Sequence, residues 1–345
     1  MDGNGRRKRM IVSWLTTNQC NLKCRHCYQD AGSRRDKELN TEEAKKMIEE
    51  IKAAGFKIMI FSGGEPLMRP DIYELVSYAS AQGLRPVFGT NGTLITEDTA
   101  KKLKECGAKA MGISIDSLDQ EKHNYFRGKE DAYQLTMEGI ENCKKAGLPF
   151  QIHTTIMDWN QNEVCDIIDF SVRTGAIACY LFFLIPVGRG KFLERTTLEV
   201  LEYENLLKTI MEKQKQVPID IKPTCAPQFI RVAKQMDVKT RFQKGCLAGL
   251  SYCIIDPTGT VRPCAYMVEE AGNVRQEPFD QIWRNSSLLN HLRTRHYKGT
   301  CHGCAYEEEC GGCRARAGYY HEGDYMGEDS YCAYGKGFEA GGTWA

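Results

Sequence analysis

The stretch NTEEAKKMIEEIKAAGFKIMIFSGGEP, residues 40–66, contains one amphipathic helix followed by one apolar strand. Ala44, Met47, Ile48 and Ile51 recur at the helical spacing i, i+3, i+4 and i+7, which makes one apolar stripe. Gly55 can take the left-handed conformation that ends a helix. The apolar run that follows lacks clean alternation, as expected for a strand covered on both faces. This order predicts the repeating unit of an α/β fold.

The same unit recurs along the first two-thirds of the chain. The expected strands are MIVSWLTT from Met10, KIMIFSG from Lys57, RPVFGTN from Arg85, AMGISID from Ala110, PFQIHTT from Pro149 and CYLFFLI from Cys179. A helical pattern follows each strand, and five of these helices end at a glycine, namely Gly55, Gly83, Gly107, Gly147 and Gly175. Six successive β-α units predict parallel strands with right-handed crossovers. An open (β/α)6 partial barrel fits best, and a doubly wound sheet is the alternative.

Polar and glycine-rich segments follow the expected strands at their carboxyl ends. A cysteine loop follows the first strand, SGGEP the second and TNGT the third, and PVGRG follows the sixth. Barrel enzymes build their sites at this edge. We therefore expect the functional site there.

Charge and hydropathy exclude several classes of partner. The 345-residue chain has 46 basic and 45 acidic residues, so no global field recruits nucleic acid or an anionic membrane. The basic run Arg6–Arg9 is expected to be simply solvated at a disordered terminus, residues 1–9. The longest strongly apolar run, YLFFLIPV from Tyr180, is too short to span a bilayer, and no secretory signal begins the chain. A soluble, cytoplasmic protein is expected.

Sixteen cysteines without a secretory signal indicate metal binding rather than disulfides. In TTNQCNLKCRHCYQDAG, residues 16–32, three thiols lie within eight positions: Cys20, Cys24 and Cys27. Three thiolates from one loop suit an iron–sulfur cube that leaves one iron without a protein ligand. Four dispersed cysteines are expected to be small buried hydrophobes: Cys106, Cys143, Cys165 and Cys179. Cys225, between two prolines, is a candidate for the site.

The motifs CNLKCRHCY and GGEP, one strand apart, resemble those of the radical S-adenosylmethionine (SAM) superfamily over roughly residues 10–215. The resemblance implies that the free iron of a [4Fe–4S] cluster chelates SAM, which is cleaved to a 5′-deoxyadenosyl radical. By position, Gly63, Gly64 and Glu65 match the segment that holds the methionine amine, and Ser114 and Asp116 match ribose contacts. The other matches to the SAM pocket are Tyr28, near the adenine, Asn91 and Arg127. Asn91 is alternatively a turn residue, and Arg127 a surface ion pair.

The last third of the chain is rich in cysteine and loses the β-α rhythm from about residue 225. Cys246, Cys253 and Cys264 surround a predicted hairpin with DPTG as its turn. The segment CHGCAYEEECGGC then places Cys301, Cys304, Cys310 and Cys313 in the pattern C-x₂-C-x₅-C-x₂-C, and Cys332 follows. Structural zinc is one interpretation of these pairs.

The same spacing resembles the SPASM extension of radical SAM enzymes, which binds auxiliary [4Fe–4S] clusters. Carried over by position, one cluster is held by Cys246, Cys253, Cys264 and Cys313, and the other by Cys301, Cys304, Cys310 and Cys332. The segment CGGC has two residues where the extension usually has three, so the sequence leaves one or two auxiliary clusters open. The expected domains are a radical SAM core at 10–224 and a SPASM-type domain at 225–335, before a disordered tail at 336–345.

Longer stretches, among them SWLTTNQCNLKCRHCYQDAG, IKPTCAPQF and CRARAGYYHEGDYMGEDSYC, resemble the heme synthases of the alternative, siroheme-derived heme pathway. The resemblance implies oxidative decarboxylation of two propionates of Fe-coproporphyrin III to vinyl groups, which gives heme b. Loss of CO₂ leaves one electron, for which an auxiliary cluster is the expected acceptor. A ferredoxin or flavodoxin is the expected electron donor, and the chain is expected to act as a monomer without nucleic acid or membrane.

Fixed cations and histidines are candidates for binding the substrate. The candidates, with Cys225, are His153, Arg189, Arg314, Arg316 and His321, and each is alternatively a structural residue. Three other functions remain open: the didecarboxysiroheme deacetylase of the same pathway, a SPASM-type peptide maturase, and a non-catalytic iron–sulfur electron-transfer protein.

Overall fold

The computed structural model describes residues 10–34 and 36–334, so the expected disordered ends and the basic run Arg6–Arg9 lie outside the described residues. Within that part, ten strands form one sheet in the order β10-β9-β8-β1-β2-β3-β4-β5-β6-β7. The strands are β1 (Ile11–Leu15), β2 (Ile58–Ser62), β3 (Arg85–Thr90), β4 (Met111–Ser114), β5 (Phe150–Ile156), β6 (Ala178–Phe183), β7 (Asp220–Thr224), β8 (Tyr252–Ile255), β9 (Thr260–Arg262) and β10 (Gly272–Asn273).

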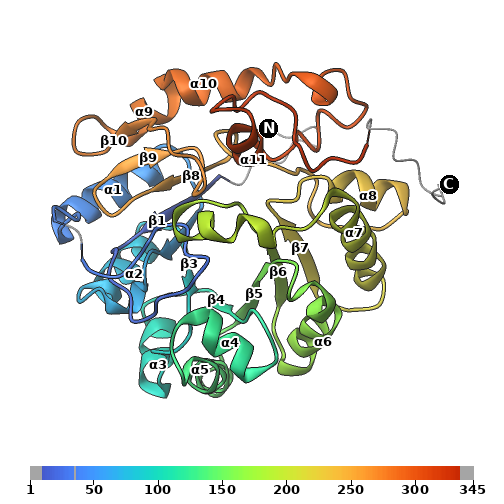
Figure 1. Cartoon of the computed structure of the whole chain (residues 1–345). Helices are drawn as coiled ribbons and strands as arrows, with labels where there is room; N and C mark the ends of the chain where they lie inside the picture. The colour runs from blue at the N-terminus through green and yellow to red at the C-terminus, as the bar shows by residue number, and fades with distance from the viewer. Residues whose placement is uncertain (1–9, 35, 335–345) are drawn as a thin grey trace.

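All six expected strands are present as β1 to β6, and each pairs in parallel with the next. Their spatial order follows the chain without reversal, which excludes a doubly wound sheet, where the order reverses at a switch point. Figure 1 shows the strands as an arc with helices on its outer side. The α/β partial-barrel prediction is therefore confirmed.

The helices cover the outer face of the arc and the C-terminal side. They are α1 (Thr41–Ala53), α2 (Ile72–Ala81), α3 (Glu97–Glu105), α4 (Gln120–Arg127), α5 (Ala132–Ala146), α6 (Val164–Thr174), α7 (Val200–Gln214), α8 (Phe229–Gln235), α9 (Phe279–Asn285), α10 (Ser287–Thr294) and α11 (Arg314–Tyr320). Short 3₁₀ turns lie at η1 (Pro66–Met68), η2 (Gln161–Glu163), η3 (Gly188–Thr196) and η4 (Gly299–Cys301). All five glycines expected to end helices have positive φ, from 60° at Gly147 to 96° at Gly107. No helix in the described part of the chain is long and apolar enough to cross a membrane.

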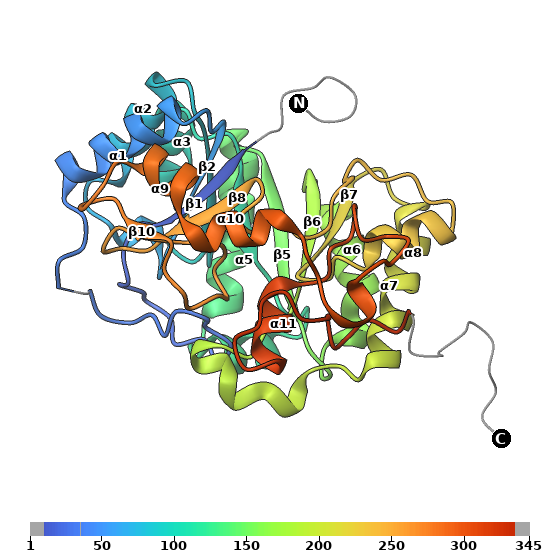
Figure 2. The same ribbon diagram turned by 90° about the horizontal axis from the view of Figure 1, so that it is seen from above.

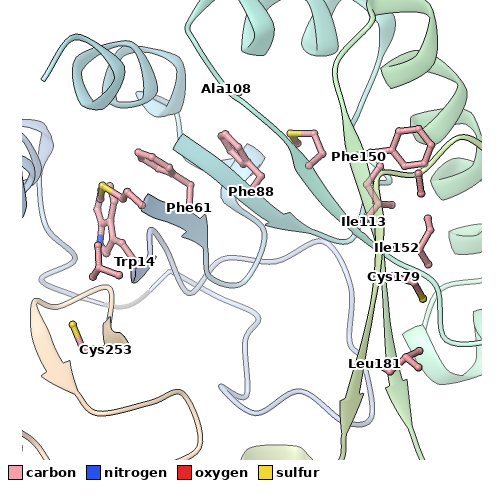
Figure 3. Packing of buried hydrophobic residues seen from close by; sticks show 14 of the residues in the cluster. Trp14, Phe61, Phe88, Ala108, Ile113, Phe150, Ile152, Cys179, Leu181 and Cys253 are labelled. Carbon is pink, nitrogen blue, oxygen red and sulfur yellow. The ribbon is translucent and has the colours of Figure 1, made fainter. Parts of the chain in front are cut away.

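The hydrophobic core lies between the sheet and the outer helices (Figure 3). Trp14, Phe61 and Phe88, on three neighbouring strands, pack with ring centroids 5.9 and 5.5 Å apart. Accessibility alternates along β5 to β7, where every second residue is half-buried and faces away from this core. These residues line what we call the inner wall, the concave face of β5–β7. The wall is thus partly accessible, whereas the sequence indicated strands covered on both faces.

The C-terminal third extends the sheet, which the sequence did not predict. The additional unit β7–α8 continues the parallel series, and β8 pairs in parallel with β1 at the other edge. The expected hairpin is present as β8–β9, where the Asp256 carboxylate accepts hydrogen bonds from the backbone of Thr258 and Thr260. Figures 1 and 2 show the remaining segment, coloured orange to red, spanning the opening between the β1 and β7 sides of the arc.

Candidate functional site: a cysteine loop, a SAM pocket and two thiol sets

The three cysteines of the first loop lie after β1, and we call residues 16–32 the thiol loop. Backbone N–H groups point at two of its sulfurs, from Leu22 to Cys20 Sγ at 3.4 Å and from Ala31 to Cys27 Sγ at 3.4 Å. Burial raises the pKa of Cys20 to about 12, and the charges of Glu65, Cys24 and Cys27 add to the rise. Thiols that affect one another in this way, with donors aimed at their sulfurs, suit an anionic metal–thiolate group.

Gly63 and Gly64 place the second loop directly against the thiol loop. The Gly64 N–H donates to Thr17 O and the Glu65 N–H to Gln19 O, both at 2.8 Å. A Cβ at Gly63 would lie 2.6 Å from Thr17 O, and one at Gly64 would lie 2.2 Å from Gln19 O. Only glycine permits this approach, so the pair fixes one backbone against another.

Glu65 is fully buried at the junction of these loops. Its carboxylate accepts hydrogen bonds from Thr90 Oγ1 at 2.8 and 2.9 Å, Asn91 N at 2.9 Å and Leu67 N at 3.2 Å. Burial raises its pKa to about 7, and these neutral donors offset the rise only in part. Glu65 has no cationic partner among the residues that the structure describes, and such a buried carboxylate is suited to a ligand ammonium.

Asn91 and Ser114 lie at the carboxyl ends of the next two strands, β3 and β4. The Asn91 side chain donates to Asn21 Oδ1 at 2.9 Å and accepts from Thr93, so it ties the third loop to the thiol loop. Ser114 Oγ donates to Thr90 O at 3.2 Å and is half-buried. Asn91 is therefore more than a turn residue, since its side chain bridges two loops of the site.

Asp116 and Arg127 form a buried ion pair, with Asp116 Oδ2 2.7 Å from Arg127 Nη2. Arg127 Nη1 also lies 3.7 Å from Cys24 Sγ, so the alternative of a surface ion pair is wrong. Burial raises the pKa of Asp116, but the Arg127 charge reverses the effect and the pKa is lowered overall. The pair places a positive charge beside one thiol of the loop.

The residues of this edge fit a cluster-bound SAM. Three thiols, a buried carboxylate for an ammonium and a cation beside one sulfur are the donor set that the resemblance requires. Tyr28 packs against Tyr266 with centroids 5.3 Å apart, which leaves an aromatic surface beside the third thiol. The roles of these residues in binding SAM stay predictions.

Arg189 holds the thiol loop, which differs from its expected role in binding substrate. Its guanidinium donates to Cys24 O at 2.9 Å, Asp30 Oδ1 at 2.7 Å and Ala31 O at 2.8 Å. These bonds use the Nε and Nη1 donors of the guanidinium. Arg189 is thus a brace of the loop, and sequence could not show this because the partners are more than 150 residues away.

Cys225, and not Cys253, meets the other three thiols of the first expected auxiliary set. Cys225 shares a side-chain hydrogen bond with Cys313, which raises the pKa of Cys225 and lowers that of Cys313. Burial raises the pKa values of Cys246 and Cys264, and the charge of the nearby Cys313 raises both further. Cys225 has φ of 59°, a left-handed conformation that costs a non-glycine residue free energy and is kept only where the surroundings impose it.

Cys253 lies elsewhere, in the core on the outer face of the sheet. It pairs with Val12 across β8–β1 and is drawn among the buried residues near Trp14 in Figure 3. The charged group beside it is Arg293. The assignment of Cys253 as a cluster ligand is therefore wrong, and we call Cys225, Cys246, Cys264 and Cys313 the first thiol set.

The second expected set is largely brought together. Burial raises the pKa values of Cys310 and Cys332, and the charge of the nearby Cys301 raises both further. Cys304 follows η4 in the same loop, where its sulfur accepts a hydrogen bond from Tyr306 N at 3.5 Å. Among the described residues, no three Cys, His, Asp or Glu side chains form a site for a single metal ion.

Arg314 and Arg316 are structural, in contrast to their predicted contact with substrate. Both are at most 2% exposed. Arg314 donates to the carbonyls of Tyr325 and Gly327, at 2.9 and 2.8 Å. Arg316 pairs with Asp329 at 3.3 Å and donates to Cys225 O at 2.8 Å. Both guanidinium groups thus bind atoms of the chain itself.

The two histidine candidates lie in different places. His153 is on the inner wall, packed against Tyr180 and Phe182 with centroids 5.2 and 5.3 Å away, and burial lowers its pKa to about 4. His321 Nε2 lies 3.0 Å from Glu328 O, in the C-terminal segment. Of the two, His153 faces the interior of the barrel.

Sequence reasoning missed two residues that support the site. Thr90 holds the Glu65 carboxylate, and its position just before the quoted Asn91 could have pointed to it. Asp329 accepts from Cys313 N at 2.6 Å and from Gln228 at 2.7 Å, besides pairing with Arg316. No local pattern marks Asp329. Of the four cysteines expected to be buried hydrophobes, Cys143 and Cys179 are buried, whereas Cys106 and Cys165 are only partly so.

Comparisons with known proteins agree with this arrangement. The Radical SAM superfamily model matches residues 14–171, and the SPASM iron–sulfur cluster-binding domain matches residues 246–314. The chain is 40% identical to an AdoMet-dependent heme synthase from Methanosarcina barkeri over 95% of this chain and 97% of that protein. It is 30% identical to the Fe-coproporphyrin III synthase of the same organism, over 94% and 88%.

Solved structures share the fold. The crystal structure of Streptococcus suis SuiB bound to its precursor peptide SuiA superposes with a TM-score of 0.77 at 16% identity, over 94% of this chain and 76% of that one. The expected [4Fe–4S] cluster, SAM and auxiliary iron–sulfur binding are thus supported at the level of the family. The chain belongs to the radical SAM superfamily, among the members that carry a C-terminal SPASM domain.

Proposed function

We propose that this protein is a heme synthase that converts two propionates of Fe-coproporphyrin III to vinyl groups. Per propionate, one SAM is consumed, and the products are the vinyl group, CO₂, methionine and 5′-deoxyadenosine, so atoms and electrons balance. The observation that carries the proposal is the partly accessible inner wall, where His153, Tyr180 and Phe182 offer flat aromatic surface at the edge that carries the thiol loop. The 40% identity to the AdoMet-dependent heme synthase of Methanosarcina barkeri supports heme synthesis as the function.

Different groups of described residues are proposed to bind the clusters and SAM. We propose that the three thiols of the thiol loop hold the SAM cluster and that Glu65 binds the methionine ammonium. When bound, this cluster supplies the electron that cleaves SAM. The first thiol set, with Cys225, and the second set would hold the auxiliary clusters, and cysteine-ligated clusters exchange electrons. A ferredoxin or flavodoxin would reduce the protein, which we place, as a monomer, in the reducing cytoplasm.

The test is anaerobic turnover of the reconstituted full chain with SAM, dithionite and Fe-coproporphyrin III. Mass spectrometry should show the successive loss of two formic-acid equivalents from the porphyrin. Substrate deuterated at the propionate β-carbon should pass one deuterium to 5′-deoxyadenosine. A Cys24→Ala variant is the control and should form neither product.

Two other outcomes would contradict the proposal. Conversion of didecarboxysiroheme to Fe-coproporphyrin III, without vinyl formation, would assign the deacetylase reaction of the alternative pathway. Absence of 5′-deoxyadenosine with every porphyrin, in protein with a full complement of iron, would favour a non-catalytic electron-transfer protein. A peptide substrate, as in the SuiA complex, would instead be shown by SAM cleavage that depends on an added peptide.

A further inference from the structure

Lys222 is a cation on the inner wall that has no anionic partner among the described residues. It is half-buried on β7, and its Nζ lies 4.3 Å from the centroid of the Phe242 ring. Among the described residues, none forms a hydrogen bond or ion pair with the Lys222 ammonium; the hydrogen bond from Thr224 Oγ1 goes to the Lys222 backbone carbonyl. The nearby Arg241, by contrast, pairs with Asp220 at 2.7 Å. Withdrawing an ammonium from water costs free energy unless an anion compensates it.

Register places Lys222 in line with the SAM pocket. Ser114, His153, Tyr180 and Lys222 are direct neighbours across β4, β5, β6 and β7. Neighbouring strands lie about 4.8 Å apart, so Lys222 is about 14 Å across the wall from Ser114. A ligand that reaches from one to the other must be large.

The surface between these two residues is aromatic. His153 and Tyr180 lie in the row itself, and Phe182, two positions after Tyr180 on the same face of β6, packs against His153. Tyr180 also contacts Phe242, the ring beneath the lysine, with centroids 6.2 Å apart. Such a surface suits a flat, conjugated ligand, for which ring contacts supply affinity.

The other cations considered for carboxylate binding already have partners within the chain. Arg189, Arg314 and Arg316 each donate to backbone carbonyls, and Arg189 and Arg316 also pair with carboxylates. We propose that Lys222 binds a carboxylate of a large planar substrate. On the proposed function, on which this inference rests, the group is a propionate that is not reacting, held while the opposite side of the porphyrin faces the pocket at Ser114.

Lys222 has one competing role, because the thiols of Cys246 and Cys225 in the first thiol set lie near it. Burial and the Arg241 charge lower the pKa of Lys222 to about 8, and these two thiols oppose the fall. Lys222 would then compensate the charge of a thiolate-bound cluster. That role predicts a change in the potential of an auxiliary cluster and none in substrate binding. Carboxylate binding predicts the reverse.

The experiment titrates reconstituted full-length protein with Fe-coproporphyrin III and with its tetramethyl ester, without SAM, following the porphyrin absorbance. Lys222→Met should weaken binding of the acid about tenfold to a hundredfold and leave binding of the ester unchanged. Lys222→Arg should restore most of the affinity. The exposed Lys239→Met, which removes a charge elsewhere on the chain, is the matched control.

Unchanged binding of the acid by Lys222→Met would overturn the inference, whether or not a cluster potential shifts. Equal losses for acid and ester would overturn it too, since they would indicate packing rather than charge. If the wild-type protein bound neither porphyrin, the proposed function would fail and its propionate assignment with it. If the wild type bound the porphyrin and Lys222→Met bound it equally well, the proposed function would stand and only the role of Lys222 would be refuted.

Discussion

Replacing Glu65 by Gln removes one buried negative charge while keeping the size of the side chain. The amide oxygen of the variant can still accept from Thr90 or Asn91, whereas alanine would leave several buried donors without an acceptor. Gln is therefore the cleaner change, because effects on the loop itself stay small. The variant isolates the attraction between the carboxylate and the ammonium of SAM.

The magnitude follows from the type of bond that is lost. A hydrogen bond between charged partners contributes roughly 1.5–3 kcal/mol, so SAM affinity should fall about tenfold to a hundredfold. Burial raises the pKa of Glu65 to about 7 in the SAM-free protein. SAM binding needs the ionised carboxylate, so wild-type affinity should fall as the pH falls below this value, by at most about tenfold per unit. The Glu65→Gln variant has no carboxylate to protonate, so its SAM affinity should not fall with pH for this reason.

The assay is anaerobic calorimetric titration of reconstituted protein with SAM, above and below pH 7. Glu105→Gln is the matched control, because Glu105 is exposed at the end of α3. Iron content should be equal in all three proteins. Wild-type affinity in the Glu65→Gln variant, or the same pH dependence, would refute the role of the carboxylate.

Alanine at any one of the three cysteines of the thiol loop should abolish 5′-deoxyadenosine formation while most auxiliary iron stays bound; near wild-type cleavage would disprove the assignment of the SAM cluster. Cys225→Ala should lower iron and acid-labile sulfide, whereas Cys253→Ala should leave both unchanged, and the reverse result would restore Cys253 as the ligand. Arg316→Met breaks the buried pair with Asp329 and should cost about 3–5 kcal/mol of stability, measured by chemical denaturation. A substrate role for Arg316 would instead raise KM at unchanged stability.

Local patterns in the sequence determined the core of the fold and the first site. Helical spacing and capping glycines depend on neighbouring residues only, and they located six strands and the helices between them. The thiol loop and GGEP are equally local. Parallel strands bring their carboxyl ends to one edge, so the thiol loop, Glu65 and Asn91 could be placed together before the structure was known.

Only the tertiary structure decided which distant groups meet. Cys253 is near Cys246 in the chain, yet its place on β8 opposite Val12 turns its thiol to the outer core. Because side chains alternate along a strand, a shift of one position selects the opposite face. Cys225, by contrast, reaches the first thiol set through a left-handed turn after β7, a strand that the sequence did not reveal. The roles of Arg189, Arg314 and Arg316 differ from the expected ones for the same reason. Their charge is visible in the sequence, but the carbonyls and carboxylates that bind a guanidinium are brought near it only by the folded chain.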